Sequence, residues 1–270
     1  MSPASVAAVA EELIAIDGAA RIVPPFTDRH AQLTARDGYA AARALHAHRL
    51  AQGWRPVGRK IGFTNRGIWP RYGVDEPIWG YVYDRTEVIA HAGRARLPLA
   101  GLVQPRIEPE VLFRLKAAPP RAAKPEALIE SIEWIAHSLE IVQCVHPDWR
   151  FKLADCTANN ALHGRLIVGA PLPIAALRGL AENLPALKVT LRKADTVVDH
   201  GVGANVLGSP LQALAYLAEL LARDAEAAPL CAGEIVSTGV LTDAHPIAPG
   251  ETWRTAFEGL PLAGLEVSFT

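Results

Sequence analysis

Cysteine is scarce in this chain, with three residues, Cys144, Cys156 and Cys231, and no Cys-x-x-Cys spacing. An odd number without paired spacing argues against a disulfide framework and against a cysteine-rich zinc site. The first residues also lack the basic segment of a signal peptide, and Glu11 and Glu12 interrupt their apolar run. We therefore expect a soluble protein of the reducing cytoplasm.

Long apolar runs and an excess of charge of one sign are missing too. No stretch approaches the roughly 18 uninterrupted apolar residues of a membrane span. The net charge is −1 and no run of Lys and Arg occurs, which argues against a nucleic-acid partner. With 270 residues, half of them hydrophobic, the chain can bury one large core or two unequal ones.

Hydrophobic periodicity predicts a small helical region followed by a mostly β region. Residues 5–16 and 36–51 have helical periodicity, with a Pro-containing connector between them. After residue 54, short β-like runs bounded by Gly and Pro take over, as in a sandwich, roll or barrel. We expect strands at 57–63, 86–90, 106–115, 138–145, 164–169, 186–193, 196–199, 234–239, 252–257 and 265–270.

One strong helix is expected among these strands, at residues 209–225. Ser209 is a suitable N-cap, and Pro210 suits the first helical position. The apolar residues form one stripe, so we expect the helix to pack on the sheet. The stripe consists of Leu214, Leu217, Leu220 and Leu221.

The segment RIEPEVLF (106–113) places two carboxylates on one strand face. Side chains alternate along a strand, so Glu108 and Glu110 point to the same side. Such a pair is either a solvated face or one half of a cation site. Pro109 favours a sheet edge or a bulge, and bulges also occur beside active sites.

A third acid, Glu140, lies in the apolar run AHSLEIVQCV, which predicts a strand buried on both faces. An unpaired buried carboxylate costs several kcal/mol or becomes protonated. No Lys or Arg lies nearby in the sequence to compensate it. A divalent cation shared by Glu108, Glu110 and Glu140 would explain all three, and oxygen ligands favour Mg²⁺ or Mn²⁺.

The run VGRKIGFT places Lys60 on the same strand face as Gly58 and Gly62, with open space around its amine. Glycine within a strand often marks the close approach of a ligand or of another backbone. Lys60 is therefore either a surface lysine on an edge strand or, beside a metal–carboxylate cluster, a proton donor or acceptor.

These segments resemble the 2-keto-4-pentenoate hydratase / 2-oxo-3-hexenedioate decarboxylase family of the fumarylacetoacetate hydrolase superfamily. The resemblance covers about residue 23 to the end. It rests on GRKIGFT, YGVDEPIWGYV, IEPEVLF, SLEIVQC, WRFKLADCTANNALHGRLIVG, GVGANVLGSPLQAL and STGVLTDAHPIAPGE, in this order. It implies an α+β chain: an N-terminal helical region with the lysine-bearing strand (1–75) and a β-rich, roll- or sandwich-like catalytic domain (76–270).

The resemblance also implies roles for individual residues. Glu108, Glu110 and Glu140 would bind the metal, and Lys60 and Asp75 would act in acid–base chemistry. Three further residues would contact the substrate: Thr64, Thr238 and Gly239. Without the resemblance, Asp75 is equally well a turn residue before Pro77, and the two threonines are equally well strand-end hydrogen-bonding residues.

The implied function is a hydratase that adds water to a 2-hydroxydienoate or 2-oxo-alkenoate in aromatic catabolism, giving a 4-hydroxy-2-oxo acid. A 2-oxo-3-hexenedioate-type decarboxylase, a fumarylpyruvate-type C–C hydrolase and a non-enzymatic domain with a structural metal are the alternatives. Ala158-Asn159-Asn160 departs from the family's Ala-Asp-Asn, which leaves the substrate open. Arg66, Arg71 and His245 are either surface residues or contacts of a distal carboxylate. The family implies a homo-oligomer.

Overall fold

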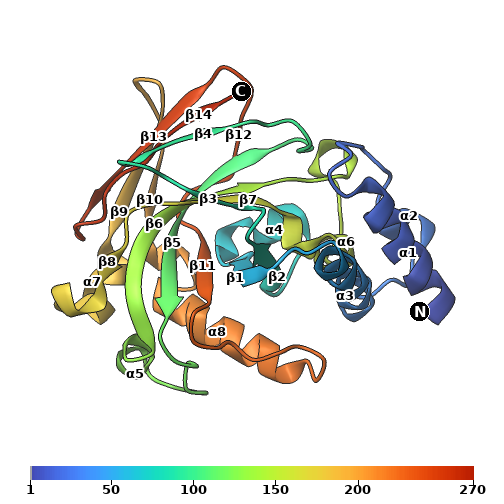
Figure 1. Cartoon of the computed structure of the whole chain (residues 1–270), viewed down its shortest axis with the longest axis horizontal. Helices are drawn as coiled ribbons and strands as arrows, with labels where there is room; N and C mark the ends of the chain where they lie inside the picture. Colours follow the sequence, from blue (N-terminus) through green and yellow to red (C-terminus); the bar gives the residue numbers. More distant parts are fainter. Residues whose placement is uncertain (1) are drawn as a thin grey trace.

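The computed structural model describes residues 2–270 and places N-terminal helices beside two β-sheets (Figure 1). Within these residues, the larger sheet has nine strands, with β8 and β12 attached beside β6 and β5. Its main order is β2 (Ile78–Tyr83), β1 (Pro56–Gly62), β11 (Ile235–Val240), β5 (Arg106–Leu115), β6 (Ile132–Val142), β7 (His163–Val168) and β3 (Glu87–Ile89). The attached strands are β8 (Leu172–Pro173) and β12 (His245–Pro246).

The smaller sheet has five strands among the described residues, in the order β10 (Thr196–Val202), β9 (Lys188–Lys193), β13 (Thr252–Glu258), β14 (Glu266–Phe269) and β4 (Arg94–Leu97). Apolar side chains join the two sheets in one core cluster, which includes Ile107, Leu139 and Ile141 from the larger sheet and Trp253, Val267 and Phe269 from the smaller one.

The helices confirm the periodicity of the sequence. The expected helices are α1 (Pro3–Ile16), α3 (Ala35–Ala51) and α8 (Pro210–Arg223). Thr34 and Asp37 form a capping box at the start of α3. In α8, Leu214, Leu217 and Leu221 are buried in the core cluster that also contains Val236 of β11.

Shorter helices escaped prediction because they are too brief for a periodic pattern. They are α2 (Phe26–Arg29), α4 (Trp69–Tyr72), α5 (Pro125–Ile129), α6 (Leu153–Ala158) and α7 (Leu180–Ala186). Strands β2 and β4 were also missed. Within residues 2–270, none of the helices combines the length and apolar composition needed to cross a bilayer.

The long pair β5–β6 holds the centre of the larger sheet. Its register sets Glu108 opposite Glu140 and Glu110 opposite Ser138. Val111 and Phe113 point to the face of the sheet that packs on α8. Leu112 points to the opposite face, which carries the carboxylates, and packs there with Val82 of β2, Leu166 of β7 and Ile235 of β11. The carboxylates therefore lie on the inner face of a curled sheet.

Pro109 of β5 lies next to an irregularity in the pairing of β5 with β11. The register between β5 and β11 shifts between Ser237 and Val240, and Leu241 N–H donates to the Pro109 carbonyl at 2.9 Å. The extra residue of this irregularity is in β11, between Ser237 and Val240, and Pro109 pairs with Leu139 of β6 without a register shift, so the association of Pro109 with a bulge stays a prediction. The division at residue 75 stays a prediction. It falls between β1 and β2, which pair with each other.

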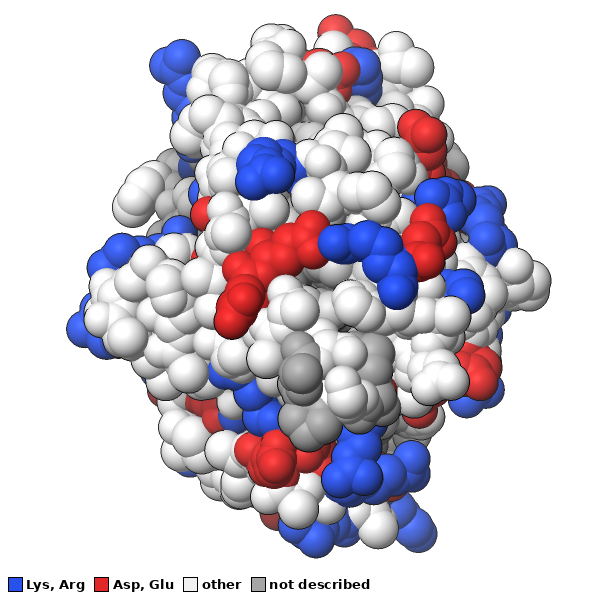
Figure 2. All heavy atoms as spheres, turned by 90° about the vertical axis from the view of Figure 1, so that its right-hand side faces the viewer, with Lys and Arg blue, Asp and Glu red and all other residues white. Residues whose placement is uncertain are grey.

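On the face that carries the N-terminal helices, basic and acidic side chains are interspersed (Figure 2). This agrees with the formal net charge of −1.

Candidate active site

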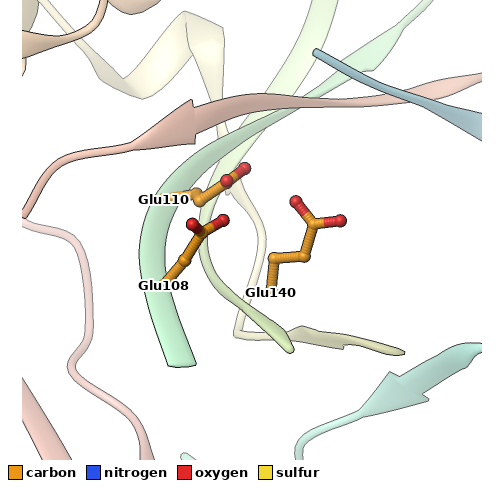
Figure 3. A group of neighbouring side chains, drawn as sticks. All are labelled: Glu108, Glu110 and Glu140. Carbon is orange, nitrogen blue, oxygen red and sulfur yellow. The ribbon is translucent and has the colours of Figure 1, made fainter. Parts of the chain in front are cut away.

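Three glutamates converge at the centre of the larger sheet (Figure 3). Glu108 and Glu110 project from β5, and Glu140 projects from β6; each offers an oxygen within 4.8 Å of the other two. Oxygens that share one Mg²⁺ or Ca²⁺ lie about 2.1–2.6 Å from it, hence at most about 5 Å from one another. The spacing fits a single hard cation.

Glu110 is fully buried and is held by β11. Its Oε2 accepts hydrogen bonds from Ser237 Oγ at 2.5 Å and from Gly239 N–H at 3.0 Å. Gly239 has a φ of 101°, and a Cβ there would lie 1.9 Å from Thr64 Oγ1. Glycine is therefore required for this contact. Among the described residues, Glu110 Oε1 has no hydrogen-bond partner, so it is free to bind a cation.

Glu140 is fully buried and is oriented by a histidine. His163 Nδ1 lies 2.8 Å from Glu140 Oε1, and His163 Nε2 lies 2.9 Å from Thr86 Oγ1. A carboxylate only accepts, so His163 Nδ1 carries a proton and donates it to Glu140 Oε1. This arrangement turns the other oxygen, Oε2, toward Lys60.

Lys60 lies beside the carboxylates and is 3% exposed. Its Nζ is 3.3 Å from Glu140 Oε2 and donates to the Ala161 carbonyl at 3.1 Å. Ala161 belongs to three successive left-handed residues, Asn160–Leu162, with φ of 47°, 53° and 64°. The Asn160 side chain fixes this segment by pairing with both the N–H and the carbonyl of Tyr81. Strained backbone of this kind is common at functional sites.

The carboxylates repel one another in the cation-free protein. Burial and the charge of Glu140 raise the pKa of Glu108 to about 7, partly offset by Lys60. Burial and the two neighbouring carboxylates raise the pKa of Glu110 well above its usual range. Burial opposes ionisation of Glu140 as well, but Lys60 and His163 outweigh it and hold its pKa below the ordinary value.

The donor set therefore fits a divalent cation. Three ionised glutamates and one ammonium leave an excess of negative charge, which a divalent cation would balance. The unpartnered Glu110 Oε1 and the Glu140 Oε2 that faces Lys60 are oriented to receive it. All the ligand atoms are carboxylate oxygens, the type that Mg²⁺ and Mn²⁺ prefer.

A pocket that is partly open to solvent leads from the carboxylates to the surface. Lys60, Glu108, Glu110 and Gly239 line it, together with many apolar side chains. The structure thus brings together the predicted metal ligands, the predicted lysine and Gly239. Their roles stay predictions.

Four predicted site residues are not among those that line the pocket: Glu140, Asp75, Thr238 and Thr64. Asp75 is exposed and is not among the residues that line the pocket. Thr238 Oγ1 donates to the Val111 carbonyl at 2.8 Å, and Thr64 Oγ1 is buried without a partner among the described residues. For Thr238 the structure shows the strand hydrogen bond that was the alternative. The predicted roles of these residues stay predictions.

His163 and Ser237 were missed by the sequence analysis. Each contacts a glutamate that is far away in the sequence, and each stands in an ordinary strand pattern. For His163, the sequence offered one indication of a special role, namely a histidine at the start of the apolar run HGRLIV.

No protein-family model matches the chain. It is 34% identical over 262 residues to 2-keto-4-pentenoate hydratase 2 of Dechloromonas aromatica, covering 96% of this chain and 95% of that one. It is 31% identical to a 4-oxalocrotonate decarboxylase of Pseudomonas sp., covering 84% and 85%. The solved 4-oxalocrotonate decarboxylase of Pseudomonas putida G7, complexed with magnesium and adipate, superimposes with a TM-score of 0.89 at 27% identity, covering 100% and 99%. The predicted α+β fold and the predicted family are thereby confirmed. This chain belongs to the family of 2-keto-4-pentenoate hydratases and 4-oxalocrotonate decarboxylases.

Proposed function

We propose that this chain is a metal-dependent hydro-lyase that adds water to a 2-hydroxydienoate, or to its 2-oxo-alkenoate tautomer, in aromatic-compound catabolism. The product is a 4-hydroxy-2-oxo acid. The observation that carries the proposal is the convergence of Glu108, Glu110 and Glu140 beside Lys60. Lys60, Glu108 and Glu110 line one pocket. The hydratase relative, at 34% identity over nearly the whole chain, supports it.

Glu108, Glu110 and Glu140 would hold Mg²⁺ or Mn²⁺ at the base of the pocket. Such a cation, when bound, supplies Lewis-acid stabilisation of negative charge on the C2 oxygen of a 2-oxo acid. Ser237 and Gly239 N–H keep Glu110 in place, and His163 does so for Glu140.

Lys60 is the residue that moves a proton in this proposal. An ammonium has three N–H donors. Ala161 O accepts one of them and Glu140 Oε2 lies 3.3 Å away as the ion-pair partner, so the ammonium can still donate to a substrate atom in the pocket. Lys60 delivers a proton to the far carbon of the conjugated system and takes up the proton that the substrate's C2 hydroxyl loses, so it ends this step as an ammonium again. Water then adds across the C3–C4 double bond of the resulting unsaturated ketone, with its oxygen bonded to C4 and a proton to C3. Asp75 stays the predicted second acid–base residue.

Decarboxylation of a 2-oxo-3-hexenedioate is the second candidate. The same carboxylate cluster would serve it, because loss of CO₂ also leaves negative charge that the C2 oxygen can accept. The high structural similarity to the Pseudomonas putida G7 decarboxylase supports this second candidate.

Product mass distinguishes the candidates. The protein is incubated with Mg²⁺ and either 2-hydroxypenta-2,4-dienoate or 2-oxo-3-hexenedioate, with Lys60→Met as the control. We expect gain of water from the dienoate with the native protein and none with the variant. Loss of CO₂ from 2-oxo-3-hexenedioate without hydration of the dienoate would establish the decarboxylase, and no turnover of either would contradict the proposal.

A small-molecule 2-oxo acid is the partner that this site fits. We also propose a homo-oligomer in the cytoplasm, as the family implies. Size-exclusion chromatography with light scattering would test the oligomeric state.

A further inference from the structure

Four aromatic side chains form one side of the pocket: Phe63, Tyr72, Trp149 and Phe151. We call them the aromatic wall. Tyr72 stacks on Phe151 with ring centroids 5.3 Å apart, and Phe63 and Trp149 lie 6.2 and 6.3 Å from the same ring. The rings therefore form a continuous apolar surface.

The aromatic wall lies on the outer side of the carboxylates. Arg106 follows Glu110 and Glu108 on the same face of β5, about 7 Å beyond Glu108. Its guanidinium donates to the Tyr72 hydroxyl at 3.1 Å and lies 4.0 Å from the ring centre of Trp149. A substrate bound by its C1 carboxylate at the glutamates would thus extend its far end along this wall.

The local backbone holds two of these rings in place. Phe63 and Trp149 adopt left-handed conformations, with φ of 55° and 57°, which bulky residues rarely do. Trp69 Nε1 donates to the Phe63 carbonyl at 2.8 Å, and Trp149 Nε1 donates to the Gln104 carbonyl at 3.0 Å. Strained residues held in this way persist where the surroundings fix them, often at ligand sites.

The outer pocket offers no uncompensated positive charge among its described lining residues. Arg71 lines it, but its Nη1 lies 3.5 Å from Asp243 Oδ2, which lines the pocket as well. Lys60 is paired with Glu140. The other cation nearby, Arg106, is outside the lining and is engaged by Tyr72 and Trp149.

His245 and Arg66, two other residues that could contact a distal carboxylate of the substrate, are engaged elsewhere. His245 Nε2 is 2.7 Å from Asp199 Oδ2, and the Arg66 guanidinium lies 5.7 Å from the ring centre of Trp69. Neither lines the pocket.

We propose that the aromatic wall makes this site selective for 2-oxo acids whose far end is an uncharged alkyl, alkenyl or aryl group, against those that end in a second carboxylate. The inference rests on the proposed function, since it takes the C1 end to bind at the glutamates. Placing a carboxylate against aromatic rings removes its hydration without supplying a partner, whereas an apolar group gains from burial there.

Calorimetric binding to the Mg²⁺-loaded protein tests this with two unreactive probes of equal length, 2-oxohexanoate and 2-oxoadipate. We expect 2-oxohexanoate to bind about tenfold more tightly or better. Equal affinity, or tighter binding of 2-oxoadipate, would overturn the inference while leaving the proposed function intact. If neither probe binds in a Mg²⁺-dependent way, the proposed function fails and the inference fails with it.

A charge variant tests the role of the Arg71–Asp243 pair. Asp243→Asn leaves Arg71 without its partner, so 2-oxoadipate should bind about two- to fivefold more tightly, in line with the strength of exposed ion pairs. The affinity for 2-oxohexanoate should stay within about twofold. In the double variant Asp243→Asn/Arg71→Gln the gain should vanish. A gain for both probes alike, or no gain for 2-oxoadipate, would contradict the inference.

Discussion

Replacing Glu108 by Gln should stabilise the cation-free protein and weaken its response to Mg²⁺. Burial and the neighbouring Glu140 carboxylate raise the pKa of Glu108 from 4.5 to about 7, partly offset by Lys60. A tenfold change in a protonation equilibrium corresponds to about 1.4 kcal/mol, so the ionised side chain destabilises the folded state by about 3 kcal/mol. Allowing for its partial solvent access, we expect about 2 kcal/mol.

The pH dependence has a definite sign. Below pH 4.5 the carboxyl is protonated in both the folded and the unfolded protein, so the folded state keeps its full stability. As the pH rises through 7, the unfolded protein releases this proton more readily than the folded protein, and that stability is lost. In EDTA, Glu108→Gln should match the native protein near pH 4.5 and exceed it by about 2 kcal/mol at pH 8. Urea denaturation at both pH values, with the exposed Glu130→Gln as control, measures this difference.

Magnesium should reverse the order. A cation at a hundred times its Kd stabilises the native protein by about 2.7 kcal/mol. The variant lacks one ligand and should gain much less at the same concentration. A Glu108→Gln protein that is less stable than the native one in EDTA at pH 8, or that gains as much from Mg²⁺, would refute this account.

Further predictions concern the residues around the carboxylates. Lys60→Met should abolish turnover but retain Mg²⁺ binding by calorimetry; full activity of the folded variant would exclude its proton-transfer role. His163→Leu should lower Mg²⁺ affinity about 10- to 100-fold, because it orients a ligand; unchanged affinity would contradict this. Gly239→Ala should cost about 3 kcal/mol or more in urea denaturation, since its Cβ would clash with Thr64. Gly208→Ala, with a similar φ of 91° but open space, should cost about 1–2 kcal/mol; equal losses would exclude the clash.

Much of the carboxylate cluster could be predicted from local patterns. Period-two alternation placed Glu108 and Glu110 on one face, and the apolar neighbours of Glu140 indicated a buried acid that needs a partner. Flanking glycines singled out Lys60. These features depend only on neighbouring residues, so a single sequence contains them.

The parts that escaped prediction depend on long-range contacts. His163 and Ser237 meet Glu140 and Glu110 only because β7 and β11 lie beside β6 and β5. Strand β2, with the sequence IWGYVY, was missed although it pairs with the lysine-bearing strand. Asp75 is likewise exposed in the connector between α4 and β2, a placement that the family resemblance did not specify.

A crystal structure with Mn²⁺, using its anomalous scattering, tests the central claim most directly. We predict a single anomalous peak within coordination distance of Glu108, Glu110 and Glu140, with Lys60 Nζ facing the same space. A peak bound elsewhere, or no peak at these glutamates at millimolar Mn²⁺, would contradict the account.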